Sequence, residues 1–415
     1  MPEAFQTRAA RIIARCRELA RVTDVPGETT RLFLSPATRD AHTLVGWWMR
    51  QAGLEVRVDD AGSLRGLQRA VSDAGVGEEG APTVVLFSHL DTVPNAGAFD
   101  GPLGVLLGIA VAEELTGEPL PFHLEVLAFS EEEGVRFGFP FFSSRAAVDD
   151  VAEDLLTRTD SRGASVAQAI RTFGLDPDRI STSARLRPNT RAAIEVHIEQ
   201  GPVLESLDVP LGVVDTVIGQ SRLELTFTGQ ANHAGTTPMP LRRDALVAAA
   251  HWIGEVERFA SGYKQLVATV GRVEVAPGAV NVVPGEVRLS LDVRHPGDES
   301  RHAAVARLLA KAEHIAAARG ISVRARVLAE QASVPLSAAL AEGLEAAAEV
   351  AGYRTHRMYS GAGHDAMILA PHVPTAMLFV RSPGGLSHHP DESVLEADVE
   401  AALATVLELV QHLHL

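Results

Sequence analysis

Hydrophobic residues follow one pattern along the first half of the chain and another pattern further on. Before about residue 209, short apolar runs stand between segments in which apolar residues recur at helical spacing. Such runs indicate strands buried on both faces, as in parallel sheets, and the segments between them indicate covering helices. The predicted strands are residues 54–58, 83–87, 124–129 and 192–198, and the predicted helices are residues 9–20, 39–52, 104–115 and 166–173.

From about residue 209 the predicted strands alternate between apolar and polar positions. The order of elements is strand 222–228, helix 245–259, strands 266–275 and 287–293, helix 303–319 and strand 321–327. This β-α-β-β-α-β order is that of the ferredoxin-like unit, and the alternation predicts a sheet with one less buried face. Helix 336–351, strand 375–380 and helix 399–415 then return to the first pattern.

These patterns predict an α/β protein of two parts. Residues 1–211 and 329–415 are expected to form a catalytic domain with a mixed, mostly parallel sheet flanked by helices. Residues 212–328 are expected to form an inserted ferredoxin-like α+β domain that acts as a lid and as a dimerisation surface. A chain of 415 residues is long enough for such an arrangement.

Composition narrows the classes of partner and the compartment. The chain has 37 basic and 53 acidic residues, a net charge of −16, which argues against a nucleic-acid partner. Its single cysteine, Cys16, excludes an intrachain disulfide and lies in a helical pattern, where a small buried side chain is expected. Residues 1–17 lack the apolar segment of a secretory signal, and no run reaches the roughly 18 apolar residues that suggest a membrane span. We therefore expect no membrane partner and a cytoplasmic location.

Potential metal ligands follow three of the predicted buried strands. His89, Asp91 and Asp100 follow the first, the acidic residues 131–133 follow the second, and His197 lies near the end of the third. Carboxyl ends of parallel strands meet at one edge of a sheet, so these imidazoles and carboxylates are expected to lie together. Each group alone has a simpler interpretation, such as a core histidine or a solvated acidic turn, and the coincidence of three favours a metal site.

Six motifs together resemble a known family. They are Ser88-His89-Leu90-Asp91-Thr92-Val93-Pro94, the acidic pair before Gly134, His197-Ile198-Glu199-Gln200-Gly201-Pro202, Asn232-His233-Ala234-Gly235-Thr236-Thr237-Pro238-Met239, Gly361-Ala362-Gly363-His364-Asp365 and Ser387-His388. In this order they resemble the two-metal amidohydrolases of the aminoacylase/carboxypeptidase type. More narrowly they resemble the hydantoinase/carbamoylase branch, which holds N-carbamoyl-L-amino-acid hydrolases, β-ureidopropionases and allantoate amidohydrolases.

The resemblance implies two divalent metal ions per subunit. Asp100 would bridge the ions, His89 and His197 would complete one of them, and Glu133 and His388 would complete the other. Mixed imidazole and carboxylate ligands suit Zn²⁺ first, with Mn²⁺, Co²⁺ and Ni²⁺ as alternatives.

Other residues near these ligands also match the family's pattern. Glu132 resembles the family's general base, which takes a proton from the attacking water and later delivers it to the leaving nitrogen. Asp91 is expected to lie behind the ligands and to orient His89. Glu131 matches no role and is expected to be solvated.

The resemblance also implies which residues hold the substrate. His233 would stabilise the oxyanion of the tetrahedral intermediate, in its own or in the partner subunit's active site. Gln200, Asn281, Arg294 and Gly363 match positions that hold the ureido group and the carboxylate. For Arg294 a surface ion pair is the simpler alternative.

The residue at one predicted metal-ligand position indicates which branch of the family the chain resembles. The peptidases of the family usually carry an acid where this chain has His197, so histidine there favours hydrolysis of a ureido C–N bond in a small ureido acid. Some allantoate-type members carry two arginines where this chain has Ser221-Arg222, so an N-carbamoyl-L-amino acid is preferred over allantoate. The alternatives are a zinc aminoacylase or exopeptidase, and an inactive binding protein of the same fold. A homodimer through the inserted domain is expected, with hinges near residues 209–213 and 328–332.

Overall fold

The computed structural model describes residues 7–71 and 80–413, and the chain divides into two compact units. Unit 1 comprises Met1–Asp215 and Pro335–Leu415, and unit 2 comprises Thr216–Val334. The sequence predicted domain boundaries after residues 211 and 328. Both lie a few residues before the boundaries between the two units, which follow Asp215 and Val334. Two expectations fall partly on residues that the structure does not describe. They are the absence of a signal segment in residues 1–17 and the predicted helix 399–415.

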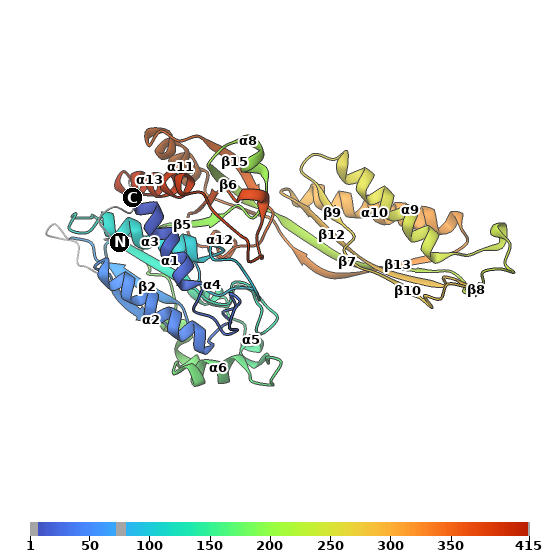
Figure 1. Ribbon diagram of the computed structural model, residues 1–415, viewed down its shortest axis with the longest axis horizontal. Coiled ribbons are helices and arrows are strands. Elements are labelled where there is room, and N and C mark those ends of the chain that lie inside the picture. The colour runs from blue at the N-terminus through green and yellow to red at the C-terminus, as the bar shows by residue number, and fades with distance from the viewer. Residues whose placement is uncertain (1–6, 72–79, 414–415) are drawn as a thin grey trace. The chain divides into compact units, whose positions relative to one another are not determined.

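Unit 1 is built on a mixed sheet with a parallel centre (Figure 1). Strands β4, β3, β5 and β16 run parallel in that order, because helical crossovers connect them along the chain. Antiparallel strands flank this centre on both sides, with β1 and β2 beyond β4 and with β6 beyond β16. The strands are β1 (Glu55–Val58), β2 (Leu64–Gln68), β3 (Thr83–His89), β4 (His123–Phe129), β5 (Thr190–Ile198), β6 (Leu211–Val217), β14 (Val334–Pro335), β15 (Thr355–Ser360) and β16 (Thr375–Val380).

Helices cover both faces of this sheet. On one face α1, α3, α11 and α13 pack against one another and against the central strands, and α4 and α12 belong to the other face. The helices of unit 1 are α1 (Arg8–Leu19), α2 (Pro36–Gln51), α3 (Pro102–Glu114), α4 (Phe142–Ala147), α5 (Glu153–Thr157), α6 (Val166–Phe173), α7 (Ile180–Ser183), α8 (Val203–Leu207), α11 (Ala338–Val350), α12 (Ala366–Leu369) and α13 (Glu396–Gln411). None of the helices in the described part of the chain is long and apolar enough to cross a membrane.

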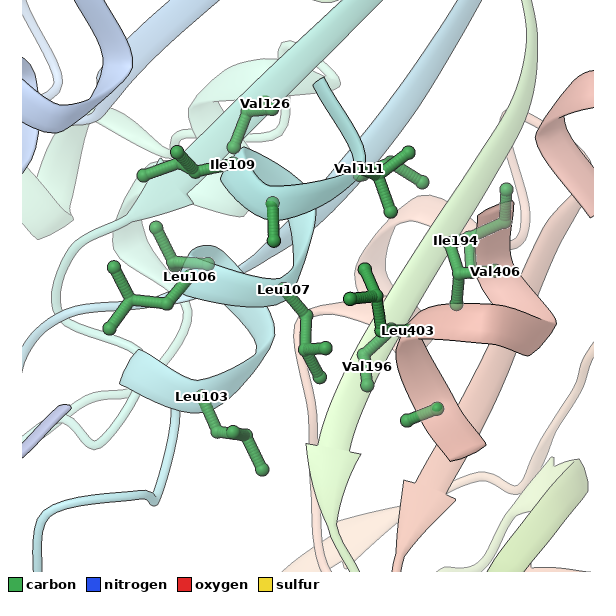
Figure 2. Close-up of a cluster of buried hydrophobic side chains, with 14 of the residues drawn as sticks. Leu103, Leu106, Leu107, Ile109, Val111, Val126, Ile194, Val196, Leu403 and Val406 are labelled. Atoms are coloured by element: carbon green, nitrogen blue, oxygen red, sulfur yellow. The ribbon is translucent and has the colours of Figure 1, made fainter. Parts of the chain in front are cut away.

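Helix α3 lies at the centre of the larger core. It is apolar on all sides and buried from Pro102 to Ala112, as expected for a helix between a sheet and other helices. Figure 2 shows Leu107 of this helix pointing toward β5 and α13, where Val196 and Leu403 lie. A Cβ atom at Gly104 would lie 1.9 Å from the main-chain oxygen of Val196, so only glycine allows α3 to pack this closely on β5.

Unit 2 has the predicted ferredoxin-like order of elements. Helices α9 (Ala245–Ser261) and α10 (Asp298–Ala318) pack on one face of an antiparallel sheet, whose order is β10-β12-β7-β13. The strands of this sheet are β7 (Gly219–Thr228), β9 (Val267–Thr269), β10 (Val273–Ala276), β12 (Glu286–His295) and β13 (Ser322–Gln331). A separate two-stranded ribbon pairs β8 (Asn232–His233) with β11 (Val282–Val283).

The fold class predicted from the sequence is confirmed, with differences in detail. The helix predicted at 166–173 is α6, whereas the single strand predicted at 266–275 is wrong. Two short strands, β9 and β10, occupy that range and pair with different stretches of β12. The sequence did not predict strands β2, β6, β8, β11, β14 and β15. The parallel pairs β4–β3, β3–β5 and β5–β16 lie at the centre of the sheet.

Candidate metal centre

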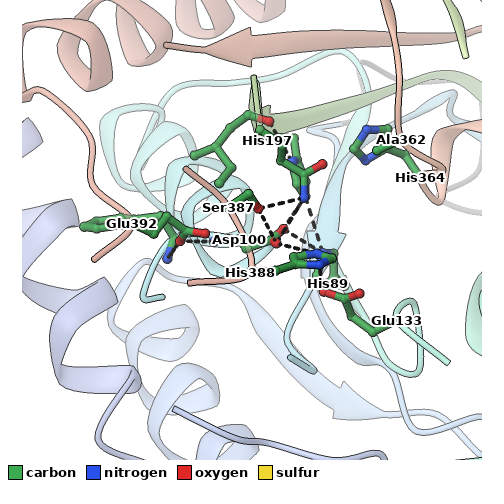
Figure 3. A network of polar contacts seen from close by, with 12 residues as sticks. His89, Asp100, Glu133, His197, Ala362, His364, Ser387, His388 and Glu392 are labelled. Carbon is green, nitrogen blue, oxygen red and sulfur yellow. Dashed lines mark hydrogen bonds and ion pairs between the residues drawn. The ribbon is translucent and has the colours of Figure 1, made fainter. Parts of the chain in front are cut away.

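Three neighbouring strands of unit 1 bring polar side chains to one edge of the sheet. Strand β3 ends at His89, β4 is followed by residues 130–133, and β5 carries His197 near its end. These strands are parallel neighbours, so their carboxyl ends coincide. Asp100, which follows β3, and His388, which precedes α13, join them in the cluster of Figure 3.

The carboxylate of Asp100 lies between two groups of side chains. Its Oδ1 atom is 3.1 Å from Nε2 of His197 and 3.8 Å from Nε2 of His89. Its Oδ2 atom is 3.2 Å from Nε2 of His388, which in turn is 3.4 Å from Oε1 of Glu133. Each oxygen of Asp100 therefore faces a different pair of possible ligands, which is the arrangement that a carboxylate bridging two cations requires.

The donor atoms of this cluster fit metal ions better than they fit one another. The Nε2 atoms of His89 and His197 face each other at 3.4 Å, while each Nδ1 atom contacts a main-chain oxygen. An Nδ1 atom that donates to a carbonyl oxygen leaves Nε2 as a lone-pair donor, and two such lone pairs repel without a cation between them. Oδ1 of Asp100 is buried without a hydrogen bond in the described structure.

Charges within the cluster shift its protonation in the metal-free protein. Burial opposes ionisation of Asp100, but the imidazoles of His197 and His388 beside its carboxylate hold its pKa well below the ordinary value. Burial also opposes the charged form of His197, yet the neighbouring carboxylate of Asp100 raises its pKa to about 9. Hydrogen bonds to Asp100 and Glu133 raise the pKa of His388 to about 10. The site thus favours positive charge around Asp100, whether protons or metal ions supply it.

Glu132 lies beside this cluster and is almost fully buried. One carboxylate oxygen of Glu132, one of Glu133 and a ring nitrogen of His89 all lie within 4.8 Å of one another. Burial, followed by the nearby charges of Glu133 and Asp365, raises the pKa of Glu132 well above its ordinary value. A carboxyl group with a raised pKa next to a cation site is suited to accept and release a proton.

Asp91 holds the loop that presents Glu132 and Glu133. Its Oδ1 atom accepts the main-chain N–H of Glu132 at 3.2 Å, and its Oδ2 atom accepts that of Glu133 at 3.1 Å. The carboxylate is 3.8 Å from Nδ1 of His89, which instead contacts the main-chain oxygen of Asp91 at 3.0 Å. The expected orientation of His89 by Asp91 thus involves its main chain, and its carboxylate positions the acidic pair.

The expectation that Glu131 is solvated is wrong. Its side chain is buried, and its Oε1 atom accepts the main-chain N–H groups of Arg136 and Phe137, each at 3.1 Å. Its backbone has a φ of 58°, in the left-handed region that non-glycine residues rarely adopt. Burial, followed by the charge of Asp91, raises the pKa of Glu131 to about 8. Glu131 turns inward and closes the loop that carries Glu132 and Glu133.

Several buried residues around the centre were not recognised in the sequence. Oε1 of Glu392 accepts the main-chain N–H groups of Phe99 and Asp100, at 2.8 and 3.0 Å, and so holds the loop that carries Asp100. Behind His197, the buried Glu195 accepts the N–H of Ala366 at 2.8 Å. A charged residue inside an apolar strand, such as Glu195 in β5, was the one signal available in the sequence.

Of the predicted substrate-binding residues, two lie in unit 1 near the centre. The amide nitrogen of Gln200 donates to Oδ2 of Asp100 at 3.1 Å and to Oγ of Ser387 at 3.0 Å, and its amide oxygen is buried without a hydrogen bond in the described structure. Gly363 lies against Phe141, because a Cβ atom there would be 2.9 Å from the Phe141 ring. Next to it, the ring of His364 packs edge-on against that of His197.

The other three predicted substrate-binding residues lie in unit 2. His233 and Asn281 are adjacent, because the N–H of Ala234 donates to the main-chain oxygen of Asn281 at 2.9 Å, and both residues are exposed. Arg294 lies on β12 and donates twice to Asp292, at 2.8 and 3.1 Å. The ion pair considered for Arg294 from the sequence is therefore present.

Comparison with known proteins identifies the family. The model of peptidase family M20/M25/M40 matches residues 85–412. The chain belongs to this family. It is 39% identical over 408 residues to the N-carbamoyl-L-amino acid amidohydrolase of Geobacillus stearothermophilus, covering 97% of this chain and 98% of that one. It is 36% identical over 433 residues to the allantoate deiminase of Arabidopsis thaliana, covering 96% of this chain and 81% of that one.

A solved structure extends the similarity to three dimensions. The amidase of the hydantoinase/carbamoylase family from Burkholderia multivorans matches with a TM-score of 0.89 at 33% identity, covering 98% of both chains. The resemblance to the hydantoinase/carbamoylase branch, inferred from the motifs, is confirmed.

Proposed function

We propose that this protein hydrolyses the ureido C–N bond of an N-carbamoyl-L-amino acid or a related ureido acid. The observation that carries the proposal is the cluster around Asp100, with Glu132 buried beside it. The similarity to an N-carbamoyl-L-amino acid amidohydrolase over nearly the whole of both chains supports the same class of substrate.

The cluster would hold two divalent cations. His89 and His197 would bind one, Glu133 and His388 would bind the other, and Asp100 would bridge them, with Zn²⁺ preferred and Mn²⁺, Co²⁺ or Ni²⁺ as alternatives. When bound, the cations would act as Lewis acids and lower the pKa of coordinated water.

Glu132 would move the proton in this reaction. Its carboxylate takes a proton from the attacking water as the water oxygen bonds to the ureido carbon. It then delivers the proton to the leaving nitrogen as the C–N bond breaks. Its burial supports this role, because a raised pKa makes the protonated form a usable intermediate state at neutral pH.

Ser221 favours N-carbamoyl amino acids over allantoate. This residue stands where some allantoate-type proteins carry an arginine. It is buried, and its Oγ atom bonds to Glu330 at 2.8 Å and to Arg301 at 3.0 Å. These contacts hold the Ser221 hydroxyl within unit 2, and serine offers no guanidinium to a substrate. Similarity to the Arabidopsis allantoate deiminase keeps allantoate as the second candidate.

The substrate-binding residues of unit 2 support a homodimer. Strand register places Arg294 opposite Gln220, whereas Glu286 lies opposite Thr228 near the ribbon that carries His233. The steps from Glu286 to Arg294 span about 27 Å at roughly 3.4 Å per residue. One small substrate therefore cannot contact both His233 and Arg294 of the same subunit. If both bind it, they come from two subunits.

Unit 2 also offers an edge for such a dimer. Strand β13 is an outer strand of its sheet, and Val327 and Leu328 on it are 60% and 48% exposed. Unpaired edge strands with exposed apolar residues favour pairing with another chain. We propose that unit 2 dimerises through this edge and acts as a lid that closes over the substrate.

The activity is tested by measuring ammonia and amino-acid release from a panel of N-carbamoyl-L-amino acids, allantoate, N-acetyl amino acids and dipeptides. We expect the highest kcat/KM with an N-carbamoyl-L-amino acid. Preference for allantoate would select the second candidate, and preference for dipeptides or N-acetyl amino acids would reject hydrolysis of ureido bonds as the main activity.

A further inference from the structure

A pocket separate from the candidate metal centre lies in unit 1, between helix α2, the edge strand β1 and the end of α6. Its volume is about 340 Å³, within the range of small-molecule sites. Its polar lining consists of Thr43 and four basic residues, and Val56, Val58, Leu64 and Phe173 form the apolar part. We name it the α2–β1 pocket. It shares no lining residue with the cluster around Asp100. The basic lining residues are Arg39, His42, Arg50 and Arg57.

The arginines of this pocket form no direct ion pairs in the described structure, although the charges of Glu125 and Asp59 act on Arg57. Among the described residues, Arg39, Arg50 and Arg57 form no salt bridge, and no aspartate or glutamate lines the pocket. The chain has a net charge of −16, so an overall excess of basic residues does not account for this gathering. An anion in this pocket would place a negative charge beside its guanidinium groups.

Two of these arginines are held in place by neutral groups. Arg39 donates to the main-chain oxygen of Phe173 at 2.7 Å, and its guanidinium lies 4.2 Å from the centre of the Phe173 ring. Arg57 donates to the main-chain oxygen of Ser183 at 2.9 Å. These single hydrogen bonds restrict the two side chains and leave their other N–H groups available for an acceptor.

His42 supplies an independent indication of a ligand site. It is 7% exposed, and neither of its ring nitrogens has a hydrogen-bond partner in the described structure. Buried polar atoms are normally paired, so two unpaired nitrogens on one pocket-lining ring require an explanation. Burial, followed by the charges of Arg31 and Arg39, lowers the pKa of His42 to about 4. The ring is therefore neutral at pH 7 and carries one N–H donor.

We propose that the α2–β1 pocket binds a small organic anion, with a phosphate or carboxylate group held by Arg39, Arg57 and His42. Guanidinium groups bind the oxygens of phosphate and carboxylate through paired, charge-assisted hydrogen bonds. The ring of Phe173 and the aliphatic side chains of Val56 and Val58 would contact an apolar or planar body. This binding is separate from hydrolysis and does not depend on the proposed function.

The test is a calorimetric titration of the full-length chain with phenyl phosphate and with benzoate, at constant ionic strength set by chloride. Each titration is made on the protein as purified and after chelator treatment, which removes anion binding at bound metal ions. We expect binding that survives chelation, and the stronger of the two probes identifies the preferred anionic group. Benzyl alcohol, which has the aromatic body without the charge, is expected not to bind.

Variants then locate the binding. The exposed pair Arg39→Gln and Arg57→Gln, combined in one protein, should weaken binding in the chelated protein about tenfold or more, because hydrogen bonds to charged groups are lost. Arg307→Gln is the matched control, since Arg307 is an exposed arginine on α10 with no ion pair in the described structure. His42→Phe should also weaken binding, and His42→Gln, which keeps a donor, should weaken it less.

Three results would overturn the proposal. They are unchanged affinity in the double arginine variant, equal binding of benzyl alcohol, and no binding of either anion to the chelated protein. The arginine variants decide the question if the His42 variants fold poorly, because both arginines are exposed.

Discussion

Replacing Asp91 with asparagine should uncouple the acidic pair from the strand that carries His89. Each carboxylate oxygen of Asp91 accepts one main-chain N–H, from Glu132 and from Glu133. In Asp91→Asn one oxygen becomes an NH₂ group, which cannot accept a hydrogen bond. A buried N–H then faces another donor, so the loop must either lose this contact or move.

The cost follows from one lost hydrogen bond to a charged acceptor, about 1.5–3 kcal/mol. If the reacting complex loses this free energy because the loop moves, kcat falls roughly 10- to 150-fold. A loss of about 1.4 kcal/mol corresponds to a factor of ten in rate. KM should change little, because Asp91 is buried behind the site. Metal content should also fall, because Glu133 would be misplaced as a ligand.

Steady-state kinetics with the best N-carbamoyl amino acid and metal analysis of the same samples measure both effects. Asp24→Asn is the matched control, because Asp24 also accepts two main-chain N–H groups, from Leu32 at 2.9 Å and Ala37 at 3.2 Å. It should lower the melting temperature without lowering kcat. Full kcat and normal metal content in Asp91→Asn would refute the assigned role, and an equal loss in Asp24→Asn would show a general effect of stability.

Four further predictions follow from the site. Glu132→Gln should lower kcat about 10²–10⁴-fold with metal content unchanged, and near-full activity would require a different base. Metal analysis of active enzyme should find two ions per chain, with activity lost to chelators, and a maximum of one ion would contradict the bridging role of Asp100. The pKa of Glu131 is raised from 4.5 to about 8, so the folded state keeps a proton that the unfolded state releases. The free energy of unfolding therefore falls as pH rises from 4.5 to 8. In chelated protein, Glu131→Gln should show no gain in melting temperature below pH 4.5 and an increasing gain up to pH 8. Mixed dimers of inactive His233→Ala and inactive Glu132→Gln subunits should recover part of the activity, and no recovery in verified mixed dimers would place His233 in its own subunit's site.

The sequence predicted which edge of the sheet carries the candidate metal centre, because buried strands appear in the sequence as short apolar runs. The apolar run before His89 and the apolar strand that contains His197 identify buried parallel strands, and such strands share a carboxyl edge. The positions of ligands within a few residues of these strand ends therefore follow from local pattern. The motifs and the family resemblance were needed for His388, which lies far along the chain in a loop before α13.

The residues that hold the ligands were harder to predict, because their partners are distant in sequence. Glu392 bonds to the N–H groups of Phe99 and Asp100 across almost 300 residues, and nothing local distinguishes it from a surface glutamate. Glu131 was misassigned for a different reason, since an acidic triplet after a strand is usually solvated. Here the left-handed backbone turns it toward main-chain donors six or fewer residues away.

Buried acids near the centre would favour the binding of cations there. Asp91, Glu132, Glu195 and Asp365 are all buried near the centre, and burial raises the pKa of each. Four carboxyl groups in a low-dielectric region would be costly if ionised without compensating charge. Bound cations would supply that charge and lower these pKa values together, so metal binding would release protons from the protein. The same acids that position the ligands therefore make metal affinity increase with pH.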